Sequence, residues 1–204
     1  MQHLPKQTAS IFEKLSRGHF INSNSVEAQQ RDRYAVIENH FDELAEYFSH
    51  IGFRLEQGDE YFYFSRQEDK VSIERKLQRA FKWIDIVDFF TTFNNSFAPG
   101  FRFSPGQITE EIKVNGLLST KLQELGKDSS RSSQEQVQKL IEQLEREGFV
   151  EKVEEFYDTY KVMASFHYLE NLVMAIDIPE DELENENEAE NRQHSQDSSE
   201  NGEN

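Results

Sequence analysis

The feature that most constrains this chain is the stretch from Val71 to Phe97, where apolar residues recur on two sides. Both sets step by three and four residues, which is the period of an α-helix. A helix that is apolar on two sides has to be covered on two sides. We therefore expect its second half to lie between two folded lobes, or between one lobe and a partner subunit. The two stripes are Ile73, Leu77, Ala80, Phe81, Ile84 and Val87, and then Trp83, Ile86, Phe90, Phe93 and Phe97.

The segment after this helix, residues 98–106, contains two prolines and two glycines. These residues interrupt regular structure, so the segment predicts a Pro/Gly hinge. After the hinge, the periodicity predicts one helix over residues 109–125. Ser132, followed three residues later by Glu135, has the spacing of a capping box and predicts a second helix over 134–147. Two strands are expected to follow, at 149–153 and 159–163. The apolar segment 163–176 fits either type of element.

The residues before the long helix show the same order of elements. Helical spacing is found over residues 8–17, about 26–39 and 41–51, and Ser25 is expected to cap the second of these helices. The pattern then changes to alternation, which predicts a β-hairpin with strands at 53–57 and 61–64. Three helices followed by a hairpin is the order of a winged helix. Along the second strand the side chains alternate between two faces, so either Tyr61 and Tyr63 or Phe62 and Phe64 face outward or toward a partner.

These patterns predict a mainly α fold with small β-hairpins, of the α+β class. We interpret it as tandem winged-helix domains joined by a long helix. The expected divisions are an N-terminal winged-helix domain at 1–69, the long helix and hinge at 70–106, a C-terminal winged-helix domain at 107–176, and a tail at 177–204.

The tail has a composition that predicts disorder. Residues 177–204 contain eleven acids and one base, so they hold −10 of the net charge of −17 and leave −7 for the rest of the chain. Such a segment has too little apolar surface to fold alone. It is interpreted as a solubilising disordered tail or, alternatively, as a negative strip that repels DNA or occupies a basic site on a partner until displaced. A core at −7 is not typical of an autonomous DNA-binding protein.

Several classes of chemistry lack their sequence signals. The chain has no cysteine, which excludes disulfides, thiolate metal sites and thiol catalysis. The six histidines are not spaced as helical metal ligands, and neither a phosphate-binding glycine loop nor a Gly-x-Ser-x-Gly turn occurs. We therefore expect no enzymatic activity and no cofactor. No apolar run is long enough for a membrane span and no secretory signal is visible, so the expected location is the cytoplasm.

Two sets of residues remain as candidate binding residues. The large apolar side chains of the hairpin and the long helix predict a partner-binding surface formed by Tyr61, Tyr63, Trp83, Ile86, Phe90, Phe93 and Phe97. Exposed bases predict contacts with the DNA backbone from Arg75, Arg79, Lys82, Lys127, Arg131, Lys139 and Arg146. The alternatives are packing within the domain for the first set, and solvated faces with internal charge pairs for the second.

Three blocks of the sequence resemble the MukE/MksE-like subunits of bacterial condensins. The first is Ile11-Phe12-Glu13-Lys14-Leu15 with Gly18-His19-Phe20-Ile21. The second runs from Asp42 to Phe48, through Gly52-Phe53-Arg54-Leu55, to Tyr61-Phe62-Tyr63-Phe64. The third is Gln138-Lys139-Leu140 and the run from Leu144 to Val150, with an acidic tail behind it. The resemblance spans most of residues 8–176.

The resemblance implies a homodimeric, non-catalytic subunit made of two winged-helix domains. Such a subunit binds a kleisin chain (MukF/MksF-like) and, through it, an SMC-type ATPase (MukB/MksB-like). It implies a cytoplasmic, nucleoid-associated complex that binds DNA, in chromosome segregation or plasmid defence. The alternatives are a dimeric winged-helix transcription regulator and an adaptor unrelated to DNA.

Removal of residues 180–204 is expected to leave the folded part intact, because this segment adds almost no apolar surface to a core. The melting temperature should change by no more than about 2 °C, which for a chain of this size corresponds to less than about 1 kcal/mol. Thermal unfolding followed by circular dichroism of the full and shortened chains measures this. A large fall in melting temperature would show that the segment belongs to the folded core.

Overall fold

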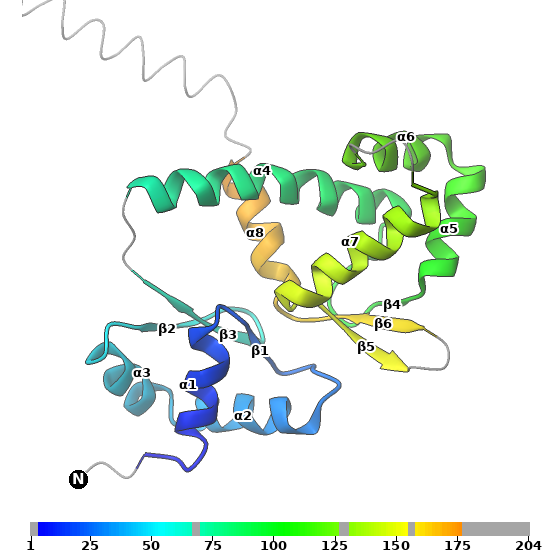
Figure 1. Ribbon diagram of the computed structural model, residues 1–204. Coiled ribbons are helices and arrows are strands. Elements are labelled where there is room, and N and C mark those ends of the chain that lie inside the picture. The colour runs from blue at the N-terminus through cyan, green and yellow to red at the C-terminus, as the bar shows by residue number, and fades with distance from the viewer. Residues whose placement is uncertain (1–3, 67–69, 127–130, 155–157, 177–204) are drawn as a thin grey trace, which may run out of the picture.

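The computed structural model describes residues 4–66, 70–126, 131–154 and 158–176, with positions 70–79, 154, 175 and 176 described by their backbone path alone. The predicted tail, 177–204, lies outside the described residues. Helices predominate and two small antiparallel sheets accompany them (Figure 1). The α+β class expected from the sequence is therefore confirmed.

The N-terminal half consists of three helices and a three-stranded sheet. Pairing joins the strands in the spatial order β1-β3-β2, so the hairpin β2–β3 gains its third strand from a segment near the N-terminus. The elements are α1 (Thr8–Ser16), β1 (Ile21–Asn22), α2 (Ala28–Asn39), α3 (Phe41–Ser49), β2 (Arg54–Gln57) and β3 (Tyr61–Ser65).

The core of this half forms under one face of β3. Phe62 is fully buried and its ring lies 5.0 Å from that of Tyr34, while the Phe64 ring lies 4.9 Å from that of Phe48. The alternation of a strand therefore turns both phenylalanines inward and both tyrosines, Tyr61 and Tyr63, to the opposite face. The buried members of this core are Ile11, Leu15, Ile21, Ile37, Leu44, Phe48, Leu55 and Phe62.

The C-terminal half repeats this sheet arrangement, because its strands lie in the equivalent order β4-β6-β5. The order of a helix, a short strand, further helices and a hairpin also recurs, with one additional helix. The elements are α4 (Lys70–Phe93), β4 (Arg102–Phe103), α5 (Pro105–Val114), α6 (Gly116–Leu125), α7 (Ser133–Glu147), β5 (Val150–Glu154), β6 (Thr159–Val162) and α8 (Phe166–Ile176).

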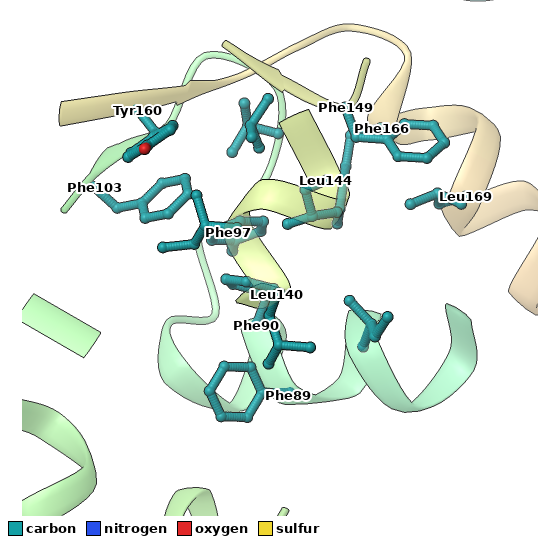
Figure 2. Close-up of a cluster of buried hydrophobic side chains, with 14 of the residues drawn as sticks. Phe89, Phe90, Phe97, Phe103, Leu140, Leu144, Phe149, Tyr160, Phe166 and Leu169 are labelled. Atoms are coloured by element: carbon teal, nitrogen blue, oxygen red, sulfur yellow. The ribbon is translucent and has the colours of Figure 1, made fainter. Parts of the chain in front are cut away.

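The long helix α4 packs into the core of the C-terminal half. It contacts α6 and α8, which cover two of its sides. Figure 2 shows Phe90 of α4 next to Leu140 of α7, and Phe89 and Leu144 belong to the same buried cluster. Phe97, beyond the end of the helix, stacks on Phe90 with a centroid distance of 4.7 Å. Trp83, Ile86 and Phe90 of the second stripe are therefore buried within the C-terminal half, whereas Phe81 of the first stripe is 53% exposed.

Three details of the predicted helices are corrected. The long helix ends at Phe93, four residues before the predicted end. The predicted helix over 109–125 is two helices, because Asn115 adopts an extended backbone and its side chain accepts a hydrogen bond from the Leu118 amide at 3.1 Å. The first of these, α5, begins at Pro105, inside the predicted hinge, where Ser104 and Gln107 form a capping box.

The predicted Pro/Gly hinge also contains the strand β4, which pairs with β6. Gly100 adopts a positive φ of 91°, and its amide donates to the Val162 carbonyl at 2.8 Å. Glycine suits this turn because other residues are strained at such a φ.

A polar segment between β1 and α2 joins the two halves. Asn22 accepts a hydrogen bond from the Ser165 amide at 2.7 Å, and Asn24 accepts one from the Ala164 amide at 2.9 Å. These bonds satisfy backbone groups just before α8 and at its start. We call residues 22–25, with their partners in the C-terminal half, the interdomain seam.

Ser25 also belongs to the seam, and its predicted role as a helix cap is wrong. Its hydroxyl donates to the Glu151 carboxylate of β5 at 2.8 Å, and the same carboxylate accepts from the Val26 amide at 2.7 Å. The residue at the cap position of α2 is Glu27, which makes no side-chain capping bond. The Ser25 hydroxyl also accepts a hydrogen bond from the Glu27 amide at 3.2 Å, so it connects the start of α2 to β5 without occupying the cap position.

Replacing Asn22 with alanine is expected to lower the free energy of unfolding by about 1–3 kcal/mol, because it leaves the Ser165 amide without its acceptor at a buried position. Urea unfolding measures the change. Asn39→Ala is the matched control, since the Asn39 side chain makes an exposed hydrogen bond to Ala35 within α2. That variant should stay within about 0.5 kcal/mol of the parent. Equal effects in the two variants would contradict a structural role for the seam.

Candidate partner and nucleic-acid surfaces

Most of the aromatic and aliphatic residues predicted to bind a partner are buried inside this chain. Ile86 and Phe90 are fully buried, and Tyr61, Trp83 and Phe97 are less than 10% exposed. Phe93 and Tyr63 are half-buried and pack against the same core. No partner is needed to cover these side chains, so any partner surface has to include other residues.

The outward tyrosines of β3 face the C-terminal half. Tyr61 and Tyr63 lie against Phe20, with ring-centroid distances of 5.7 and 6.0 Å. Phe20 in turn lies 5.4 Å from both Phe149 and Tyr168, so it joins the hairpin to β5 and α8. Burial, and then the neighbouring Tyr63, raise the pKa of Tyr61 to about 12. The seam therefore has an aromatic layer beside its polar one.

An exposed apolar surface occurs instead at the junction of α5 and α6. Val114 is 81% exposed and Leu117 is 62% exposed, although both are large apolar residues. Val114 lines an open groove of about 780 Å³ together with Phe93 and Phe101. We call Phe93, Phe101, Val114 and Leu117 the apolar corner. Exposed apolar residues that gather at one place mark interaction sites more often than isolated ones do.

A second exposed apolar region lies on the N-terminal half. Tyr47 and Ile51 are 41% and 48% exposed, and they line a groove of about 470 Å³ with Leu4, Pro5 and Phe12. Ile51 is the last residue of the helix predicted over 41–51. However, α3 ends at Ser49, and Gly52, with a φ of 81°, begins the turn into β2. Ile51 therefore lies beyond the helix and outside the core.

Three of the predicted DNA-contact residues come together in one groove. Lys82 of α4, Arg131 before α7 and Lys139 of α7 line a groove of about 660 Å³ between α4, α6 and α7. Its apolar lining includes Phe81, which is 53% exposed, and Leu125. We call this the basic groove.

Local structure fixes the position of the bases in the basic groove. The Ser132 amide donates to the Glu135 carboxylate at 2.9 Å, and the Glu135 amide donates to the Ser132 hydroxyl at 3.3 Å. This capping box, predicted from the sequence, fixes the start of α7 next to Arg131. At the opposite wall, Lys82 donates to the Gln143 side chain at 3.2 Å. A neutral acceptor leaves the charge of the lysine uncompensated at that contact.

The acidic residues Asp85 and Glu124 also line the basic groove, so its local charge is modestly positive. Of the other predicted bases, Arg146 lies two turns further along α7, at 3.6 Å from Glu147. Arg75 and Arg79 lie in the part of α4 described by its backbone, and Lys127 lies outside the described residues. The structure therefore brings three of the seven residues together.

No cluster of three or more potential metal-binding side chains occurs in the described part of the chain. Within those same residues, no helix is both long enough and apolar enough to cross a membrane.

The family model described as condensin complex protein MksE matches residues 6–173. The chain belongs to the MksE family. Because the match runs from α1 into α8, it includes both halves, the interdomain seam, the apolar corner and the basic groove. The search of curated proteins found no match. Membership makes the chain a condensin-associated subunit, and the resemblance stated from the sequence is confirmed.

The sequence patterns missed the apolar corner for a simple reason. Leu117 and Leu118 are adjacent on α6, and side chains one residue apart on a helix point in different directions. Leu118 is fully buried, so Leu117 turns outward. The pair of adjacent leucines could have predicted that one of them is exposed, because only one of two adjacent residues fits a single apolar face of a helix.

The buried position of Tyr61 predicts a pH dependence of stability. Its pKa is about 12 in the folded chain and 10.0 as the ordinary value, so the folded state holds the phenol proton more tightly. The stabilisation of the folded state by the neutral Tyr61 phenol is complete below pH 10.0 and is lost as the pH rises toward 12. Urea unfolding at several pH values in this range should give a shallower decline for Tyr61→Phe than for the parent. Identical slopes would show that Tyr61 is solvated.

Proposed function

We propose that this MksE-family chain is a non-catalytic subunit of a bacterial SMC-type condensin. In this proposal it binds the kleisin subunit as a homodimer and supports DNA organisation, chromosome segregation or plasmid defence in the cytoplasm, at the nucleoid. The match to the MksE model over residues 6–173 is the observation that carries the proposal. ATP hydrolysis is assigned to the SMC-type partner, in agreement with the missing phosphate-binding loop in this sequence.

The proposal includes two winged-helix domains. In support, both sheets have the same strand order, and in each half a short first strand pairs with the last strand of a hairpin. Helices lie between that first strand and the hairpin in both halves, with α6 as an insertion in the second. The likeness between the halves is therefore one of topology, whereas their sequences share no repeated motif.

The apolar corner is the proposed contact for the kleisin chain. Of the residues first predicted for this role, Phe93 belongs to this corner and most of the others are buried in the chain itself. Val114 and Leu117 are the most exposed large apolar side chains apart from Met174 among the described residues. Burying such side chains in an interface contributes about 1.5–3 kcal/mol each relative to leaving them in water. Loss of two of them would weaken a complex strongly.

The basic groove is the proposed contact for DNA. Lysine and arginine side chains bind phosphate oxygens without reading the base sequence, which suits a complex that organises long DNA. Direct contact by three bases would contribute a salt-sensitive part of the binding, with the other subunits supplying the rest. Arg75, Arg79, Lys127 and Arg146 remain proposed members of the same set.

The alternative function, a dimeric transcription regulator, has less support. In a winged helix the helix before the hairpin enters the major groove, and here that helix is α7. Its exposed residues include only two bases, Lys139 and Arg146, against Glu135, Glu142, Glu145 and Glu147. Four carboxylates on this helix oppose its approach to phosphates. One side of α7 also forms a wall of the basic groove.

Affinity purification of the tagged full chain from its native cells tests the proposal. A coiled-coil ATPase and a kleisin-like chain are expected in stoichiometric amounts, and the double substitution Val114→Asp with Leu117→Asp should reduce their recovery at least tenfold. Met174→Asp is the matched control, because Met174 is similarly exposed, at 67%, but lies on α8. Light scattering of the purified chain should give about twice 24.0 kDa. Recovery of the chain alone, at 24.0 kDa, would contradict the proposal.

A further inference from the structure

The basic groove has the features of a site for an acidic peptide. Two of its bases, Lys82 and Lys139, are exposed and come from different helices, so together they can bind carboxylates along an extended chain. Phe81 and Leu125 give it an apolar lining between the charges. A segment in which acidic residues flank one large apolar side chain would complement this combination.

The last described helix packs against one of the helices that form this groove. The last helix, α8, contacts α4, the helix that provides Phe81, Lys82 and Asp85 (Figure 1). In the sequence, residues 70–82 of α4 contain five bases and one acid.

The sequence after Ile176 contains the complementary pattern. Residues 180–190 hold seven acids and no base, and Leu183 stands between Glu182 and Glu184. From Asp177 to Leu183 the chain can span at most about 25 Å when extended. This length sets the farthest site that Leu183 can reach from the end of α8.

We infer that the basic groove binds residues 180–190 of the same chain, with Leu183 against Phe81 and Leu125 and the flanking carboxylates near Lys82 and Lys139. Tethering gives such a segment an effective concentration on the order of millimolar, which makes even a weak site occupied. The contact involves exposed charges, so added salt releases it. A bound segment covers the same bases that phosphate would use, and DNA or another polyanion then has to displace it.

Two features of the composition allow a direct test in the full chain. The sequence has no cysteine, so an Ala189→Cys variant takes a single nitroxide label, and it has one tryptophan, Trp83, which adjoins Lys82 in α4. The label quenches tryptophan emission only at short range. At low salt we expect at least a twofold loss of emission relative to the unlabelled variant, and recovery at about 1 M salt, where the screening length is about 3 Å.

Charge reversal identifies the groove as the site. Lys82→Glu with Lys139→Glu should abolish the quenching, whereas Lys6→Glu with Lys113→Glu makes the same change in net charge at exposed positions outside the groove and should leave it intact. Absence of quenching at low salt, or equal quenching in the two charge-reversal variants, would overturn the inference. So would quenching that increases with protein concentration, because the occupant would then come from a second copy. The test needs neither DNA nor a partner, so its outcome is separate from that of the proposed function.

Discussion

The arrangement of the two halves depends on Phe20 and the short polar segment that follows β1. Phe20 belongs to the N-terminal half by sequence, yet its ring packs in the core of the C-terminal half. The asparagines after it accept hydrogen bonds from the backbone amides of Ala164 and Ser165, in the turn just before α8. Aromatic packing and directional hydrogen bonds thus act at one place, and together they fix both distance and orientation between the halves.

This seam determines which surfaces remain for other molecules. The hairpin that could have presented Tyr61 and Tyr63 to a partner is turned onto the C-terminal half, and the second apolar stripe of α4 lies under α6 and α8. The large aromatic content of the chain is therefore used mainly for its own two cores. The apolar surface that remains exposed is small and lies at helix ends, for example at the apolar corner between α5 and α6. The exposed apolar and basic residues therefore lie on surfaces that the folded chain itself forms.

The sequence predicted the elements that depend on local periodicity. The helices α1, α2, α3 and α7, both hairpins and the capping box at Ser132 follow from spacing or from neighbouring residues alone. The two-residue strands β1 and β4 were missed, because pairing with a distant hairpin creates them and no local pattern marks them. The role of Ser25 was missed for the same reason, since its partner Glu151 lies 126 residues away. Exposure at Leu117 and burial at Tyr61 likewise depend on long-range packing.

The distribution of charge explains how an acidic chain can still present a surface for anions. At physiological salt, charges more than about 8 Å apart are largely screened from one another, so the nearest side chains matter more than the total of −17. Residues 70–82 and the basic groove form a local positive region, while much of the negative charge lies in the last 28 residues. The net charge therefore argues against strong DNA binding by the chain alone, but it is compatible with local phosphate contacts inside an assembly. Because the positive and negative regions belong to the same chain, the sequence alone is sufficient to predict an attraction between them.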